Sequence, residues 1–211
     1  MHLLLDAANT IIYKPKFYTT FVDVVNANAQ TNIEIEELSK IHKIISECFT
    51  FPDKTSKEFY YDFNKELLYA FGIVPSAALL NTLFTSCSYL PWEKYEDTKW
   101  LNEINCEKSV LSNFHNGLKD IMELLFPGQF QSLTISENEN CRKPDVNFYL
   151  AAVKKLDIDP SEIVYVGDSV KLDLEPAMAV GMKAFLIDRG NYYPHCRHRI
   201  SSFRDLAEKI K

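Results

Sequence analysis

The hydrophobic and polar positions near the start of the chain predict a buried strand. Residues 3–5 are apolar without interruption, the run stops at Asp6, and polar residues follow at Asn9 and Thr10. A short apolar run of this kind is typical of a strand covered on both faces, and open α/β sheets bind ligands at the carboxyl ends of such strands. Asp6 is therefore a candidate for chemistry, although an Asp after a strand also serves as a turn or cap residue.

The spacing of apolar positions changes after residues 13–16, where the strand pattern ends. Between residues 17 and 90 the apolar positions recur with helical spacing, and no stretch alternates as a strand does. The pattern predicts four helices packed together, at residues 17–29, 35–49, 56–71 and 77–88.

Two of these helices carry apolar stripes that predict the core of the bundle. In the third helix Phe59, Phe63, Leu67 and Phe71 recur every four residues, which is typical of packing. In the second helix we expect Lys40, His42 and Lys43 to lie off the apolar face, which is made of Ile35, Leu38, Ile41, Ile44, Ile45 and Cys48.

Beyond Pro91 strand and helix patterns alternate. After a short helix, we expect strands at residues 109–111, 131–135, 163–166 and 183–187, and helices at residues 118–125, 146–156, 172–180 and 202–210. Alternation of this kind predicts a doubly wound parallel α/β sheet with right-handed crossovers. The helical stretch then reads as an insertion, which gives a core domain of residues 1–15 and 91–211 and an inserted α-helical domain of residues 16–90.

Charge and composition narrow the range of partners. A formal net charge of -6 argues against binding to nucleic acid or to an anionic membrane, and leaves small polar or anionic metabolites. The five cysteines are scattered without a CxxC pair, which favours a reducing, cytoplasmic setting. The amino terminus lacks the basic start of a signal peptide, and no stretch is long enough to span a membrane.

Three further groups of polar residues follow predicted strands in the way that Asp6 does. They are Ser112–Asn113, Lys143–Pro144–Asp145, and Gly167–Asp168–Ser169 with Asp173 beyond it. Each has a structural explanation when taken alone, because Ser112 or Asn113, Asp145 and Asp168 are all residue types that cap helices.

Taken together and in this order, the four groups resemble the motifs of the haloacid dehalogenase (HAD) superfamily, which is dominated by magnesium-dependent phosphatases. The run 177–182 and Asp188–Arg189 also look like that family. The resemblance implies a Rossmann-like core, and the helical insertion resembles the cap domain of the helical-cap branch. It implies an enzyme, a hydrolase that acts on a small phosphorylated metabolite as a monomer or homodimer.

The resemblance also implies a role for each motif residue. Asp6 would attack phosphorus and form an aspartyl-phosphate, and Mg²⁺ would be held by Asp6, the backbone carbonyl of Ala8 and Asp168. Ser112 would bind the phosphoryl oxygens, and Lys143 would neutralise charge in the transition state. Asp173 would orient Lys143 or metal-bound water. Ala7, Thr10 and Asn113 complete the implied phosphate site.

The chain departs from the family at position 8. Phosphatases of the family carry a second Asp there, which protonates the leaving group and then activates water, whereas this chain has Ala8. General acid–base catalysis contributes about 10²–10⁴-fold, so turnover needs a good leaving group or another acid. His115 is one candidate for the missing acid. Alternatively, His115 is simply a solvated residue at the start of a helix. A phosphate-binding or regulatory protein without turnover is the alternative function.

Alanine at this position is also similar to the phosphonoacetaldehyde hydrolases of the superfamily, whose cap domain supplies a Schiff-base lysine. Lys40 or Lys43 would fill that role, although both are expected on a polar helix face.

Dehalogenation fits less well, because Gly167–Asp168–Ser169 looks like the phosphatase side of the family. The stretch His195–Arg199 offers soft metal ligands, but its arginines repel cations, so we interpret it as an exposed loop.

Overall fold

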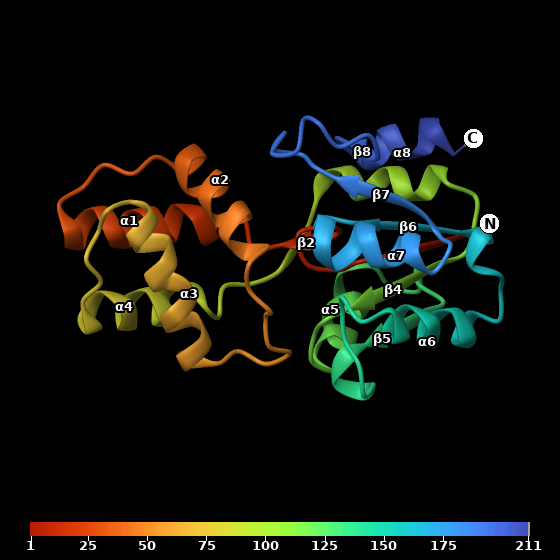
Figure 1. Cartoon of the computed structure of the whole chain (residues 1–211), viewed down its shortest axis with the longest axis horizontal. Helices are drawn as coiled ribbons and strands as arrows, with labels where there is room; N and C mark the ends of the chain where they lie inside the picture. The colour runs from red at the N-terminus through yellow and green to blue at the C-terminus, as the bar shows by residue number, and fades with distance from the viewer. Residues whose placement is uncertain (211) are drawn as a thin grey trace. The chain divides into compact units, whose positions relative to one another are not determined.

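The chain divides into two compact units (Figure 1). The computed structural model describes residues 1–210, and its first unit joins Met1–Tyr13 to the chain from Glu93 onward, while the second is Lys14–Trp92. The second unit is thus inserted into the first, and the two are described separately.

The first unit is built on a six-stranded parallel sheet. Its strand order is β5 (Ser132–Ile135), β4 (Lys108–Ser112), β1 (His2–Leu5), β6 (Ile163–Gly167), β7 (Lys183–Ile187) and β8 (Arg199–Ile200). The chain adds β4 and β5 on one side of β1, then returns to the other side with β6, β7 and β8. This confirms the predicted doubly wound α/β fold. Such a reversal of direction beside a central strand is where open sheets place their ligand sites.

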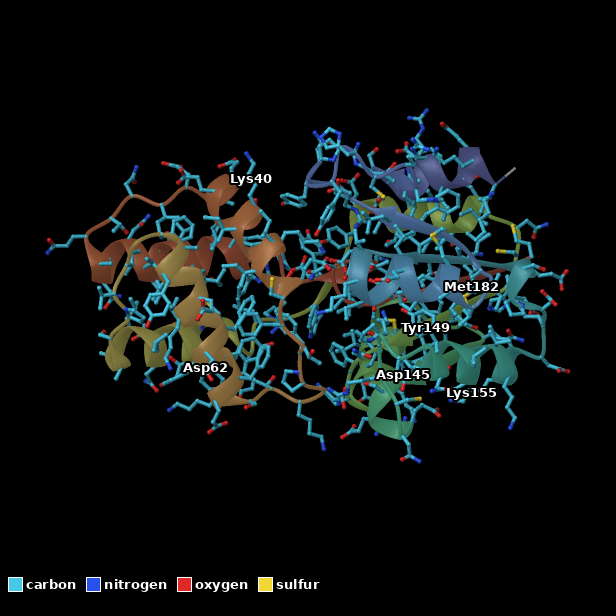
Figure 2. The ribbon with its side chains drawn as sticks, in the orientation of Figure 1. Lys40, Asp62, Asp145, Tyr149, Lys155 and Met182 are labelled. Carbon is cyan, nitrogen blue, oxygen red and sulfur yellow. The ribbon has the colours of Figure 1, made fainter. Side chains whose placement is uncertain are left out.

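Helices flank this sheet, and all but the short η2 and η3 lie near predicted positions. They are η1 (Glu96–Glu103), α5 (Leu118–Leu125), η2 (Ser136–Asn138), α6 (Val146–Leu156), η3 (Pro160–Glu162), α7 (Glu175–Ala179) and α8 (Phe203–Lys209). Asp145 caps α6 by accepting the Asn147 N–H, as the cap reading expects. Phe148 and Tyr149 of α6 pack with Met182 and sheet residues in one apolar cluster (Figure 2). Within residues 1–210, no helix has the length and apolar character needed to cross a membrane.

The stretch predicted as one helix at residues 172–180 is different in the structure. It starts as a π-helical turn, η4 (Val170–Leu174), and becomes α-helical only in α7. Asp173 and Leu174 both donate their N–H groups to the carbonyl of Ser169, which widens the turn. π-helical turns are rare in proteins overall, and those that occur are often found at functional sites. The helix prediction holds for residues 175–179 but missed the wider first turn, in which the side chain of Asp173 is buried with Lys143 and Tyr165 as partners.

Two short pairings were not predicted. β2 (Ile12–Tyr13) pairs antiparallel with β3 (Glu93–Lys94), and the ring of Tyr13 stacks on that of Tyr95 with centroids 4.1 Å apart. The edge strand β8 is equally short. Strands of two residues carry no measurable hydrophobic period, so the sequence pattern does not reveal them.

The second unit consists of four helices, α1 (Phe17–Ala29), α2 (Ile35–Ser46), α3 (Lys57–Ala70) and α4 (Ala77–Cys87). Ser56 and Ser76 cap α3 and α4 by accepting backbone N–H groups. The predicted stripe of α3 does pack in the core, where Phe63 and Leu67 are fully buried.

The predicted face of α2 was partly wrong. Leu38 is fully buried and Ile41 and Ile45 pack against the core, but Ile35, Ile44 and Cys48 are exposed. His42 instead lies against the aromatic side of the bundle, although it was expected off the apolar face. Its ring lies 5.1 to 5.5 Å from the rings of Phe17, Tyr18 and Phe63, and its Nδ1 is 3.4 Å from the hydroxyl of Tyr18.

The partial burial of His42 among these rings predicts a loss of stability in acid. Burial, with a smaller contribution from Lys43, lowers the pKa of His42 from 6.5 to about 4. The neutral ring is therefore favoured in the folded state, and stability falls as the pH drops from 6.5 towards 4, by about 1–3 kcal/mol. Thermal unfolding of the full chain measured across this range should show a shallower pH dependence in His42→Gln than in wild type. Identical slopes would contradict the assignment.

Candidate active site

Strand register brings the predicted motif residues to one edge of the sheet. Leu5 pairs with Val110 on β4 and with Val166 on β6, so the residues that follow these strands come level with one another. The N–H of Asp6 also bonds the carbonyl of Val166 at 2.9 Å, which extends the pairing by one residue. Parallel strands end on the same side, and this is why residues far apart in sequence meet here.

The carboxylate of Asp6 is buried and held by three side chains. The hydroxyl of Thr10 donates to Oδ2 at 3.1 Å, and the hydroxyl of Ser112 donates to Oδ1 at 3.2 Å. The ammonium of Lys143 donates to Oδ1 at 2.6 Å. These groups fix the carboxylate at the end of β1, so that little freedom is lost on reaction.

Lys143 is a fully enclosed cation with two anionic partners. Besides Asp6, its ammonium donates to Oδ1 of Asp173 at 2.7 Å. Burial disfavours the charged ammonium, but the carboxylates of Asp173 and Asp6 outweigh it, and the pKa of Lys143 is raised. Asn113 positions the backbone of Lys143, since its amide donates to the Lys143 carbonyl at 3.0 Å and accepts the Lys143 N–H at 2.9 Å. The side chain of Asn113 is thus engaged, and a phosphate role for its backbone stays a prediction.

Asp173 is held on three sides, and sequence reasoning missed two of its partners. Its Oδ1 accepts the hydroxyl of Tyr165 at 2.7 Å, and its Oδ2 accepts the N–H of Ser169 at 3.0 Å. Gly167 is required for this approach, because a Cβ there would lie 2.2 Å from Cγ of Asp173. A signal for Tyr165 was present, since a buried tyrosine in a central strand needs a partner for its hydroxyl.

Three carboxylates gather at this edge. One oxygen each from Asp6, Asp168 and Asp173 lie within 4.8 Å of one another. The ammonium of Lys143 pairs with two of them, so the cluster carries an excess of negative charge. The pKa of Asp6 is raised to about 6, mainly because its carboxylate is buried. The charges of Asp173 and Asp168 also raise this pKa, whereas Lys143 lowers it. A divalent cation would relieve this excess, and carboxylate oxygens are the ligands that Mg²⁺ prefers.

The loop after β1 leaves one backbone carbonyl without a hydrogen-bond partner among residues 1–210. The Ala7 carbonyl accepts the N–H groups of Thr10, Ile11 and Ile12, and the Ile12 carbonyl accepts that of Asn9. The carbonyls of residues 9–11 are also bonded, by Arg189 and Tyr95, whereas that of Ala8 has no hydrogen-bond partner among residues 1–210. The Ala8 carbonyl is therefore available to a ligand, and its role in holding a cation stays a prediction.

The structure brings no general acid to position 8. Ala8 presents only a methyl group. The ring of His115 bonds within its own turn, where its Nδ1 accepts the N–H of Gly117 at 3.0 Å. In the helical unit Lys40 is exposed (Figure 2) and Lys43 pairs with Glu47 at 3.4 Å. In the loop before β8, His195 and Arg197 are exposed, as predicted, and Arg199 pairs with Asp188.

Sequence comparison finds partial relatives. The HAD-hydrolase-like family profile matches residues 140–206. A mouse haloacid dehalogenase-like hydrolase domain-containing protein 3 is 35% identical over 80 residues, which cover 37% of this chain and 32% of that protein. A glyceraldehyde 3-phosphate phosphatase of Methanopyrus kandleri is 36% identical over 63 residues, which cover 30% of this chain and 27% of that protein. The matched segment thus spans about a third of the length of these curated relatives.

Structural comparison covers nearly the whole chain at low identity. A haloacid dehalogenase-like protein of unknown function from Agrobacterium tumefaciens has a TM-score of 0.70 at 16% identity, covering 99% of this chain and 96% of that one. The putative HAD-hydrolase YfnB of Bacillus subtilis, bound to magnesium, scores 0.66 at 15% identity, with 99% and 97% covered. An L-2-haloacid dehalogenase from Xanthobacter autotrophicus scores 0.66 at 13% identity, also with 99% and 97% covered. These likenesses concern the fold.

Proposed function

Since the chain belongs to the haloacid dehalogenase-like hydrolase superfamily, we propose that it is a Mg²⁺-dependent phosphatase that acts on a small phosphorylated metabolite through an aspartyl-phosphate on Asp6. The observation that carries the proposal is the arrangement around Asp6, whose carboxylate is bound by Lys143 and Ser112 and lies beside those of Asp168 and Asp173. The partial relatives named as glyceraldehyde 3-phosphate phosphatases support it.

The residues divide the chemistry between them. A free oxygen lone pair of Asp6 attacks phosphorus, the bond from phosphorus to the ester oxygen breaks, and the leaving group departs with the electron pair. Lys143 neutralises charge that develops on the phosphoryl group, and Ser112 turns its hydroxyl from Asp6 to a phosphoryl oxygen. Asp173, held by Tyr165 and Ser169, keeps Lys143 in place.

Mg²⁺ would be held by Asp6, the Ala8 carbonyl and Asp168, and when bound it would screen the repulsion between the attacking carboxylate and the phosphate. The YfnB protein of the same fold binds magnesium, which supports the same cation here. The compartment and the oligomeric state, monomer or homodimer, stay predictions.

A second function is favoured by one specific observation, which is the methyl group of Ala8. Without an acid and base there, the protein would bind a phosphorylated metabolite through the same residues and release it unchanged, as a binding or regulatory protein. The alternative of a Schiff-base lysine is less favoured, because the ammonium of Lys43 is paired with Glu47 and that of Lys40 is solvated.

Calorimetry with Mg²⁺ tests the metal assignment. We expect Asp168→Asn to lower the Mg²⁺ affinity by about 10-fold or more, because even outer residues of metal sites cost 10–100-fold. The matched control is Asp159→Asn, since Asp159 caps a surface turn through its side chain and Asn caps equally well. Equal affinities of wild type and Asp168→Asn would show that the site is misassigned. A screen of phosphorylated metabolites with and without Mg²⁺ would then identify the substrate.

A further inference from the structure

Arg189 follows β7, and all three nitrogens of its guanidinium group donate hydrogen bonds. Its Nε and Nη2 donate to the two carboxylate oxygens of Asp97, at 3.2 and 2.8 Å. Its plane lies over the ring of Tyr95, with Cζ 3.8 Å from the ring centroid. Asp97 is fixed in turn by the N–H of Phe203 at 3.1 Å. The guanidinium is therefore held rigidly by a bidentate ion pair and a stacked ring.

The remaining donors of Arg189 reach the loop that follows Asp6. Nη2 donates to the carbonyl of Thr10 at 3.0 Å, and Nη1 donates to that of Asn9 at 3.3 Å. The N–H of Tyr95 donates to the next carbonyl, that of Ile11, at 3.1 Å. Three successive carbonyls are thus bound by Arg189 and its stacking partner.

This loop has an uncommon backbone conformation at Asn9. Asn9 has φ of 59°, in the left-handed region, which residues other than glycine adopt rarely, although Asn does so more readily than most. The hydrogen bonds from Arg189 fall on the carbonyls of Asn9 and Thr10, so they hold the loop at the residue with this conformation. Asn9 lies between two residues of the site. The carbonyl of Ala8 has no hydrogen-bond partner among residues 1–210, and the hydroxyl of Thr10 donates to Asp6.

We propose that Arg189 is a positioning residue of the active site, which clamps residues 9–11 with the help of Asp97 and Tyr95. The clamp directs the Ala8 carbonyl towards the cation and the Thr10 hydroxyl towards Asp6. The inference rests on the proposed function for its link to Mg²⁺, while the clamp itself rests on the contacts alone. A lysine cannot replace Arg189, because one ammonium cannot span Asp97 and two carbonyls in a plane.

The neighbouring ion pair supplies a matched control. Arg199 donates to Asp188 at 2.9 Å, and the carboxylate of Asp188 also accepts the N–H groups of Tyr192 and Tyr193. This pair is partly buried, and the hydrogen bonds that the guanidinium of Arg199 makes within residues 1–210 go to Asp188 rather than to residues 8–12. Arg199→Lys therefore weakens an ion pair of the same kind without touching the loop.

The experiment compares Arg189→Lys and Arg199→Lys with wild type in the full chain. Calorimetry with Mg²⁺ alone should show about a 10-fold or greater loss of affinity in Arg189→Lys and no loss in Arg199→Lys. Amide hydrogen exchange, followed by mass spectrometry, should be faster in peptides that contain residues 9–12 in Arg189→Lys only. A loss of thermal stability without either change is what a merely structural residue would give, and it would overturn the proposal.

The two readouts separate the clamp from the function. If wild type bound no Mg²⁺, the proposed function would fail, and the exchange of residues 9–12 would still decide whether Arg189 holds the loop. Equal exchange in Arg189→Lys and Arg199→Lys would contradict the clamp whatever the metal result. If Arg189→Ala, made in parallel, does not fold, the lysine variant carries the test, because it retains the charge and most of the side chain.

Discussion

Asp6→Asn should lower the hydrolysis of a nitrophenyl phosphate by about 10⁴-fold or more, since removal of a nucleophile leaves only the contribution of binding. The amide is almost the same size as the carboxylate, so it preserves packing at the end of β1, but it cannot form the aspartyl-phosphate. Steady-state kinetics with saturating Mg²⁺ measure the effect, and Asp159→Asn serves as the control. An Asp6→Asn variant that keeps more than about a tenth of wild-type kcat would exclude Asp6 as the nucleophile.

Ala8→Asp should produce the opposite change. The first half-reaction needs no acid when the leaving group is a nitroaryl or acyl phosphate, whereas the second needs a base to activate water, and the methyl group of Ala8 cannot supply one. Dephosphorylation is then the slow step of the wild-type protein. Ala8 is partly exposed, so an added carboxylate does not enter the buried core.

Rapid mixing distinguishes the two half-reactions. Wild type should release a burst of about one equivalent of nitrophenol and then turn over slowly, because the phosphoryl group stays on Asp6. Ala8→Asp should raise the steady rate on ordinary alkyl phosphates by about 10²-fold or more. The absence of both the burst and the gain would favour the phosphate-binding protein instead.

The sequence predicts the sheet and the main residues around Asp6 because both follow from short-range patterns. Apolar runs predict β1 and β6, and a polar residue after each parallel strand must fall on one edge of the sheet. Asp6, Ser112, Lys143 and Asp173 are joined there by the hydrogen bonds of Lys143 and Ser112.

What could not be predicted depends on the packing of side chains over long separations. Arg189 reaches Asp97 across 92 positions, and neither residue stands in a pattern that predicts the pair. A buried tyrosine such as Tyr165 needs a partner for its hydroxyl, but the strand pattern does not show that Asp173 is that partner. His42 was misplaced because helical period alone does not show that aromatic rings of α1 and α3 surround one side of α2.

The central claim is that Asp6 becomes phosphorylated, and a trapped intermediate tests it most directly. Wild type mixed with nitrophenyl phosphate and Mg²⁺, then quenched in acid, should gain the mass of one phosphoryl group on the peptide that contains Asp6, because slow dephosphorylation lets the intermediate accumulate. The label should be absent from Asp6→Asn and from wild type without Mg²⁺. Nitrophenol release by wild type with no label on Asp6 at any time would contradict an aspartyl-phosphate and, with it, the role assigned to this edge of the sheet.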